Sequence, residues 1–325
     1  MIEIKRKHLP AIAILCMLVV THLVALNVVH TYPREYRAFG EDTDDPTNPL
    51  IYVGFILLFT GGMLLLFKYG KGNYLQYLIL GVVALTLFYV FYPVLWVAGY
   101  SLTQILQFDW AFFVSILLAL SLTYALYKKP EWYVVDGVGV IMGAGIAGIF
   151  GMTFGILPVF ILLIALAIYD FISVYKTKHM VSLASGIMDQ KLPVMMVVPN
   201  KKDYDFKDKE GVMDEVKEKN KDKKKKRDAM FIGLGDIIIP GILPVSASLY
   251  LPSVMVGGQY GPNLVALGSI IGALCGMFVL QRFVMKGKAH AGLPLLNSGA
   301  ILGYMTTYLL VYQNLTFGVS LAWMI

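Results

Sequence analysis

Long apolar stretches alternate with short polar connections along the whole chain. A stretch of about 20 apolar residues is long enough for a helix to cross the hydrocarbon core of a bilayer. The sequence therefore predicts nine membrane-spanning helices, at 9–29, 50–67, 74–98, 110–127, 132–151, 156–175, 230–250, 262–284 and 291–313.

The composition supports this interpretation. Of the 325 residues, 58% are hydrophobic and 15% are charged, whereas soluble domains have about one quarter charged residues. This excludes a water-soluble protein and predicts an all-α polytopic membrane protein. The basic start of the chain resembles a signal peptide, but the apolar run after it is too long and has no small-residue cleavage pattern, so we expect a retained first helix. Cys16 and Cys275 lie in apolar stretches without a ligand pattern, so we expect neither a metal site nor a cofactor.

The positions of the basic residues predict the orientation in the cell membrane. The net charge is +6, and 25 of the 27 Lys and Arg residues lie on one side of the nine-helix arrangement. The other side has only Arg34 and Arg37. Cytoplasmic connections are enriched in Lys and Arg, so we expect a multi-pass protein with a cytoplasmic N-terminus and an external C-terminus. Because almost all basic residues lie on the predicted cytoplasmic side, membrane topology accounts for the net positive charge. We therefore expect the protein to contact a lipid bilayer and not a nucleic acid.

A hydrophilic insert divides the chain into three parts, which we place at 1–190, 191–229 and 230–325. Residues 200–228 are of low complexity and carry mixed charges, which predicts a largely disordered cytoplasmic loop. Contact of this loop with anionic lipid is the alternative. The segment LPVMMVVP at 192–199 is too short to span a membrane and is rich in valine, which predicts a strand.

Two aspartates, Asp170 and Asp236, interrupt apolar stretches, where a carboxylate costs at least a few kcal/mol. Asp170 lies six residues before Lys176, and Asp236 lies eight residues after Asp228. At about 1.5 Å per residue, each carboxylate lies roughly 9–12 Å inside the cytoplasmic edge. Two adjacent antiparallel helices would therefore bring both to one depth. The alternative is that each aspartate only accepts a hydrogen bond from a neighbouring helix.

A pair of carboxylates at one depth can act together as an acid and a base. Two such groups a few Å apart in a low dielectric share a proton. One can then activate a water as a base while the other assists the departing amine as an acid, which predicts peptide hydrolysis. Gly233 and Gly235 would let a substrate backbone approach closely, and Pro240 and Pro244 should kink or loosen the helix that carries Asp236.

A third segment lies at the same depth in the last predicted span. Leu293 and Pro294 follow Lys288 by five and six residues. Pro294 would free backbone groups that can hydrogen-bond an extended substrate. The alternative is an ordinary proline-kinked membrane helix.

For several other residues in the apolar stretches, the sequence predicts hydrogen bonding, hydration or close packing. His22 and Asn27 have no metal-ligand partner at helical spacing, and we expect them to hydrogen-bond neighbouring helices. Asp136 lies near the cytoplasmic start of its span, where we expect it to stay hydrated. The pairs Gly139–Gly143 and Gly151–Gly155, in and just after the same span, have small-xxx-small spacing, which predicts close packing.

The two aspartate segments resemble the catalytic motifs of the presenilin and signal peptide peptidase family. Tyr169-Asp170 is similar to the family's Tyr-Asp, and Gly233-Leu234-Gly235-Asp236 to its Gly-x-Gly-Asp. Ala291-Gly292-Leu293-Pro294 is similar to the family's Pro-Ala-Leu motif but lacks its first proline. The orientation resembles that of presenilin-like members, and the single chain resembles a prokaryotic or archaeal homologue.

The resemblance implies a presenilin-type fold and roles for individual residues. Asp170 and Asp236 would be catalytic, Tyr169 would shape the site, and Leu234 would help to set substrate preference. The other site-shaping or substrate-binding residues would be Gly233, Gly235, Gly292, Leu293 and Pro294. The segment 192–199 would add a strand to an unwound substrate.

The expected function is therefore that of an intramembrane aspartyl endopeptidase without a cofactor or metal. Its partners would be membrane proteins with helical transmembrane segments, or remnant signal peptides, and assembly into a homo-oligomer is left open. The alternative is a transporter or cation channel that uses the intramembrane aspartates as ion or proton sites.

Overall fold

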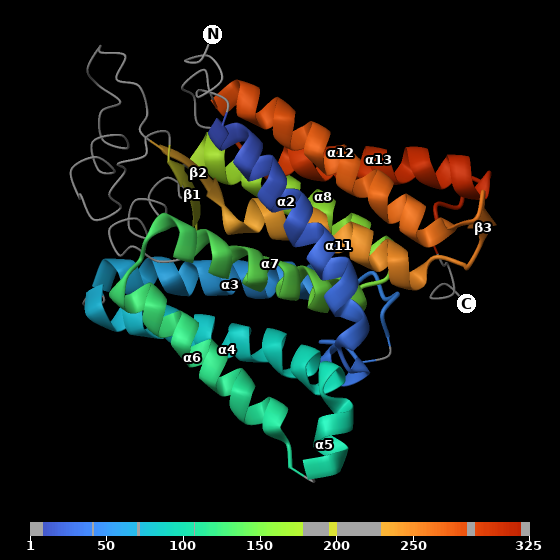
Figure 1. The fold of residues 1–325 in the computed structure, drawn as a ribbon. Helices are drawn as coiled ribbons and strands as arrows, with labels where there is room; N and C mark the ends of the chain where they lie inside the picture. Colours follow the sequence, from blue (N-terminus) through green and yellow to red (C-terminus); the bar gives the residue numbers. More distant parts are fainter. Residues whose placement is uncertain are drawn as a thin grey trace. The chain divides into compact units, whose positions relative to one another are not determined.

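The computed structural model is mainly helical (Figure 1). It describes residues 9–40, 42–69, 72–106, 108–177, 195–199, 229–284 and 290–319. The loop at 200–228, predicted to be disordered, lies outside these residues.

Within the described residues, each predicted span coincides with a helix whose ends lie within a few residues of the prediction. These helices are α2 (Leu9–Val28), α3 (Asn48–Tyr69), α4 (Gly72–Ala98), α6 (Trp110–Lys128), α7 (Trp132–Thr153), α8 (Ile156–Ile172), α11 (Leu234–Tyr250), α12 (Gly261–Val284) and α13 (Leu293–Tyr312).

In the described part of the chain, six helices are long and apolar enough to cross a membrane, which is fewer than the nine predicted. They are α2, α4, α6, α7, α8 and α12, while α3 and α11 have shorter apolar stretches. Helix α11 is shorter than predicted because residues 230–233 form a strand where the sequence predicted helix. In α13, polar residues such as Asn297 and Ser298, together with glycines, interrupt the apolar stretch.

The fold is mainly helical, as expected, and its smaller elements include short strands. Strand β1 (Met195–Pro199) confirms the predicted strand over its described part, and it pairs antiparallel with β2 (Ala229–Gly233) from Met195↔Gly233 to Pro199↔Ala229. The remaining short elements are η1 (Val29–Thr31), η2 (Arg34–Tyr36), α5 (Tyr100–Leu106), the π-helical turn η3 (Ser173–Thr177), and the paired strands β3 (Met255–Val256) and β4 (Gln259–Tyr260).

The chain forms two compact units, each assembled from separate parts of the sequence. The first comprises Met1–Met17, Met63–Met142 and Lys178–Leu234. The second comprises Leu18–Gly62, Gly143–Thr177 and Gly235–Ile325. The β1–β2 pair therefore belongs to the first unit, and both Asp170 and Asp236 belong to the second.

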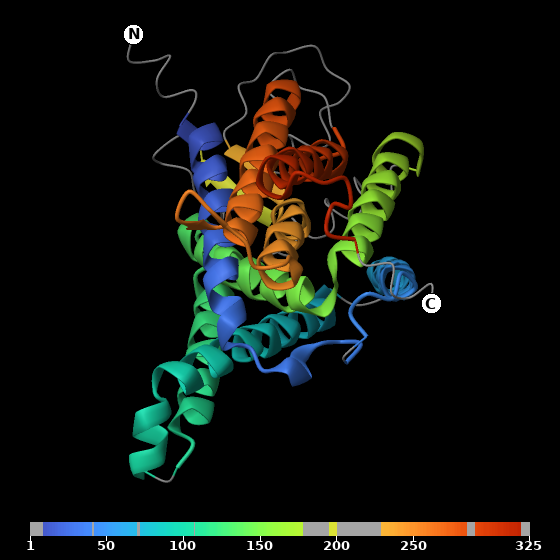
Figure 2. The ribbon, with the colours of Figure 1, turned by 90° about the vertical axis from the view of Figure 1, so that its right-hand side faces the viewer.

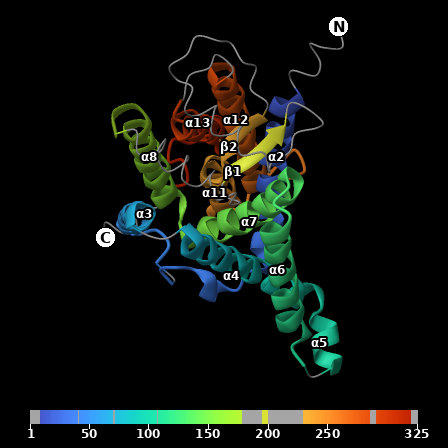
Figure 3. The same cartoon turned by 90° about the vertical axis from the view of Figure 1, so that its left-hand side faces the viewer.

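In the first unit, α4 and α6 pack along each other (Figure 3). Aromatic rings fill their contact: Phe88 is stacked on Tyr92 and meets Phe112 edge-on, with centroids 5.6 Å apart in both pairs. Asp109 caps α6 by accepting a hydrogen bond from the Phe112 N–H at 3.1 Å, and it accepts another from the Tyr92 hydroxyl at 2.8 Å. An acidic N-cap satisfies a backbone donor that the helix itself leaves free.

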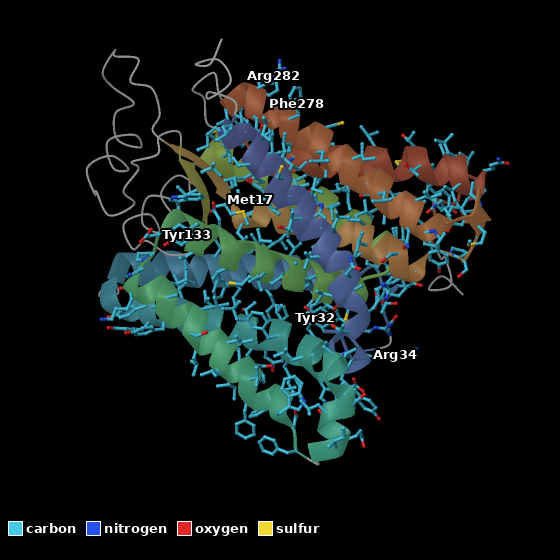
Figure 4. All side chains as sticks on the ribbon, viewed as in Figure 1. Met17, Tyr32, Arg34, Tyr133, Phe278 and Arg282 are labelled. Atoms are coloured by element: carbon cyan, nitrogen blue, oxygen red, sulfur yellow. The ribbon has the colours of Figure 1, made fainter. Side chains whose placement is uncertain are left out.

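In the second unit, α12 and α13 lie side by side (Figures 1 and 2). A glycine seam allows this approach, because a Cβ atom on Gly272 would lie 2.0 Å from the Gly299 carbonyl oxygen, and one on Gly303 would lie 2.2 Å from that of Gly268. Small residues let membrane helices bring their backbones together. Near the end of α12, the Arg282 guanidinium lies 4.5 Å from the centroid of the Phe278 ring (Figure 4).

The predicted close packing of α7 is confirmed at Gly151. A Cβ atom there would lie 2.4 Å from Cβ and Cγ1 of Val245 on α11. Ser246 strengthens this contact by donating a hydrogen bond to the Phe154 carbonyl at 2.9 Å. The second half of the helix that carries Asp236 is thus held by α7 and the residue after it within the second unit.

Candidate active site

Asp170 lies in the last turn of α8, just before the π-helical turn η3. Its side chain is 3% exposed, and its Oδ2 accepts a hydrogen bond from the backbone N–H of Leu293 at 3.1 Å. The backbone of Gly292 also interacts with this carboxyl group. The neighbouring Tyr169 is half-buried. Asp170 is therefore tied directly to the start of α13.

Asp236 lies in the first turn of α11, three residues after the end of β2. Its carboxyl group rests against Gly292, because a Cβ atom on that glycine would lie 2.8 Å from both Cγ and Oδ2 of Asp236. The Asp236 carboxyl group also interacts electrostatically with that of Asp170. The two carboxyl groups therefore converge on Gly292 and Leu293, as the depth argument expected.

The start of α13 explains how its backbone reaches the carboxyl group of Asp170. Gly292 is the N-cap, and the first turn of a helix leaves several backbone N–H groups without helical partners. One of these, on Leu293, is the donor to Asp170. Pro294 stands in this first turn, where its missing N–H breaks no helical hydrogen bond. It therefore does not kink α13, contrary to the alternative of a proline-kinked helix.

Asn297 makes a second connection between α13 and α8. Its side chain is 1% exposed, and its Nδ2 donates to the Leu163 carbonyl at 2.8 Å. Together with the bond from Leu293 to Asp170, this fixes the register of the two helices at two levels. Asn297 belongs to none of the sequence motifs, although an amide one turn after Leu293 in an apolar helix was an available signal.

The residues before Asp236 differ in their surroundings. Gly233 ends β2. Leu234 is buried, and its Cδ1 would lie 3.5 Å from a Cβ atom on Gly139 of α7. Gly235 is exposed, and a Cβ atom there would meet only Ile239 Cδ1, at 3.9 Å. There is thus open space beside Gly235, next to a carboxyl group of the pair.

Asp136 ties β1 to α7 within the first unit. Its Oδ1 accepts a hydrogen bond from the Val197 N–H at 2.8 Å, and its side chain is 6% exposed. The expectation that Asp136 stays hydrated was wrong, because β1 covers the start of α7. Since β1 pairs with β2, Asp136 holds the strand pair that leads along the chain into Asp236.

The site offers acid–base chemistry from its two carboxyl groups. One can accept a proton from water while the other donates one, and the backbone N–H of Leu293 hydrogen-bonds Asp170. In the described ranges, no group of three or more His, Cys, Asp or Glu residues could hold a metal ion.

Comparisons with known proteins identify the family. The model of the family "Signal-peptide peptidase, presenilin aspartyl protease" matches residues 15–312. A comparison with curated proteins gave no match.

Two solved structures are similar over nearly the whole chain. One, a presenilin family intramembrane aspartate protease in space group C222, has a TM-score of 0.66 and 31% identity, and the match covers 93% of this chain and 100% of the other. Another, described in the same words but in space group P2, has a TM-score of 0.64 and 32% identity, with 93% and 99% covered. Because the family match contains both aspartate motifs and the start of α13, this integral membrane protein belongs to the family of signal-peptide peptidases and presenilin aspartyl proteases.

Proposed function

We propose that this chain hydrolyses peptide bonds within helical transmembrane segments or remnant signal peptides, with Asp170 and Asp236 as the catalytic pair. The observation that carries the proposal is the convergence of both carboxyl groups on Gly292 and Leu293. Of the pair, one carboxylate takes a proton from the attacking water. The other hydrogen-bonds the carbonyl under attack and then protonates the departing amine.

An intramembrane substrate has to expose its backbone before it can be cleaved. In a helix each scissile carbonyl is hydrogen-bonded and shielded, so the helix must unwind locally. The open space beside Gly235 gives an extended segment room to approach. We propose that the β1–β2 pair accepts the unwound segment as an added strand, since strand addition supplies the hydrogen bonds lost on unwinding.

The proposed topology follows from the charge distribution. All nine helices that coincide with predicted spans would cross the bilayer, with the N-terminus cytoplasmic and the C-terminus external. The three sequence parts would then be spans one to six (1–190), a cytoplasmic segment (191–229) and spans seven to nine (230–325). A homo-oligomer is compatible with this arrangement.

The experiment that tests the proposed function separates a protease from a transporter. In liposomes, the protein should cleave a fluorescent single-span substrate, and a peptide mimic with a transition-state hydroxyl should block cleavage. A compound that imitates the tetrahedral intermediate binds the carboxyl pair more tightly than the substrate does. Proton or cation flux across the same liposomes, insensitive to the mimic and without cleavage, would instead support the transporter alternative.

A second prediction concerns the hydrogen bond between Asp136 and strand β1. Asp136→Ala should lower kcat/KM for the fluorescent substrate about tenfold, mainly through KM, because it leaves the Val197 N–H buried without its acceptor. Asp136→Asn should restore most of the loss, since its amide oxygen accepts the same bond. Thermal unfolding of both variants serves as the control. Wild-type kinetics in Asp136→Ala would show that the strand pair does not need this anchor.

A further inference from the structure

His22 is a fully buried polar residue of α2 outside the carboxyl pair. It is 0% exposed, and its Nε2 lies 2.8 Å from the carbonyl oxygen of Ile237, the residue after Asp236. A carbonyl only accepts, so Nε2 carries the proton and donates it. The expectation that His22 bonds to a neighbouring helix is confirmed. For Asn27 it was wrong, because that amide donates to the Leu23 carbonyl in its own helix at 2.7 Å.

The chain around Asp236 lacks one hydrogen bond of its own helix. Pro240 has no N–H, so the Asp236 carbonyl lacks the partner that the fourth residue onward normally supplies in a helix. The turn that carries Asp236 is therefore restrained less by its own helix than an ordinary turn. The bond from His22 reaches this same turn from another helix.

The space for the imidazole ring is provided by Gly241. A Cβ atom at this position would lie 2.6 Å from Cδ2 and 2.8 Å from Nε2 of His22. Neither ring atom can yield independently of the rest of the ring, so any side chain at position 241 would displace it. Gly241 also lies against Ala147 of α7, whose Cβ would be 3.4 Å away. The lack of a side chain at Gly241, one turn after Ile237, thus leaves space for the ring.

We propose that His22 is a positioning residue for Asp236 that acts through the Ile237 carbonyl. It holds the first turn of α11 from outside, where Pro240 has removed an internal hydrogen bond. A displacement of about 1 Å at a reacting group can cost up to about 100-fold in rate. The inference rests on the proposed function of Asp236, and it adds a residue that neither aspartate motif contains.

A merely structural role for His22 predicts a different result from positioning. If the ring only filled space, its loss would reduce the fraction of folded protein, and each surviving site would turn over at the normal rate. If the ring positions Asp236, each folded site would turn over more slowly. Titration with the hydroxyl mimic, at concentrations that saturate even a site with weakened binding, counts the folded sites and so separates the two.

The test compares two substitutions at position 22 in full-length protein in liposomes. His22→Leu fills the space without a donor, whereas His22→Gln places an amide N–H the same number of bonds from Cβ as Nε2. We expect His22→Leu to lower kcat per titrated site about tenfold or more with little change in KM, and His22→Gln to recover most of it. Asn27→Leu is the matched control, because it removes an exposed polar group of the same helix whose hydrogen bond stays within α2.

Gly241→Ala provides an independent arm if His22→Leu folds poorly. The added methyl group would displace the ring, so kcat per titrated site should fall in the same way. Equal kcat in wild type, His22→Leu and Gly241→Ala would overturn the inference, as would a loss in His22→Leu that His22→Gln does not recover. The proposed function fails separately: wild type would then show no cleavage that depends on Asp170 and Asp236.

Discussion

Replacing either Asp170 or Asp236 with Asn should abolish cleavage of a single-span substrate while leaving the protein folded. General acid–base groups contribute about 10²–10⁴-fold each, so each single variant should lose at least about 100-fold in kcat. An amide keeps the size of the side chain, and at position 170 its oxygen can still accept the bond from the Leu293 N–H. The measurement is the initial rate of fluorescent substrate cleavage in liposomes.

The control for this pair is the same chemical change at a carboxyl group elsewhere. Asp109→Asn in the first unit keeps a good N-cap for α6, because Asn and Asp cap helices about equally well. It should cleave at the wild-type rate. Equal cleavage by wild type, Asp170→Asn and Asp236→Asn would mean a contaminating protease or a mechanism that does not use the pair.

Gly292→Val should also remove most activity, by displacing the carboxyl group of Asp236. A Cβ atom at this position would lie 2.8 Å from Cγ and 2.9 Å from Oδ1 of Asp236, closer than van der Waals contact allows. A branched side chain prevents the carboxyl group from returning to its place, so we expect a loss of about 100-fold in kcat. Site titration with the hydroxyl mimic should show correspondingly weaker binding.

Gly292→Ala is the matched variant for this prediction. The family motif that Ala291-Gly292-Leu293 resembles has alanine at this place, and a single methyl group needs only a small rotation of the Asp236 side chain. We therefore expect Gly292→Ala to stay within a few-fold of wild type. If Gly292→Val were equally active, the contact between Gly292 and Asp236 would not matter for turnover.

Much of the fold could be predicted because each helix is specified by its own apolar stretch. The start of α11 could not, because residues 230–233 are apolar and suit a helix or a strand equally well. What decides is the pairing of β2 with β1, some 30 residues earlier in the chain. That pairing is a tertiary contact, and no local property of the segment contains it.

The proximity of the two carboxyl groups could be predicted because the depth of a residue in a membrane helix can be estimated by counting residues from the nearest charged residue. That count placed Asp170, Asp236 and Leu293 at one depth. In the structure Leu293 donates a hydrogen bond to Asp170, and Gly292 lies against Asp236. The partners of Asp136 and Asn297 could not be counted in this way. Asp136 bonds to the N–H of Val197, and Asn297 bonds to the carbonyl of Leu163, each in a distant segment. Almost every residue has these backbone groups, so the sequence does not indicate which one is the partner.

The glycine seam between α12 and α13 has a consequence for the membrane in which the protein works. Helix α12 has 24 residues and is thus about 36 Å long, whereas the hydrocarbon core is about 30 Å thick. Such a hydrophobic mismatch is relieved by tilting, by an amount that depends on the lipid. Because direct backbone contact couples α13 to α12, a change in tilt is transmitted to the N–H of Leu293 and hence to Asp170. We therefore expect the cleavage rate to change with the acyl chain length of the lipid.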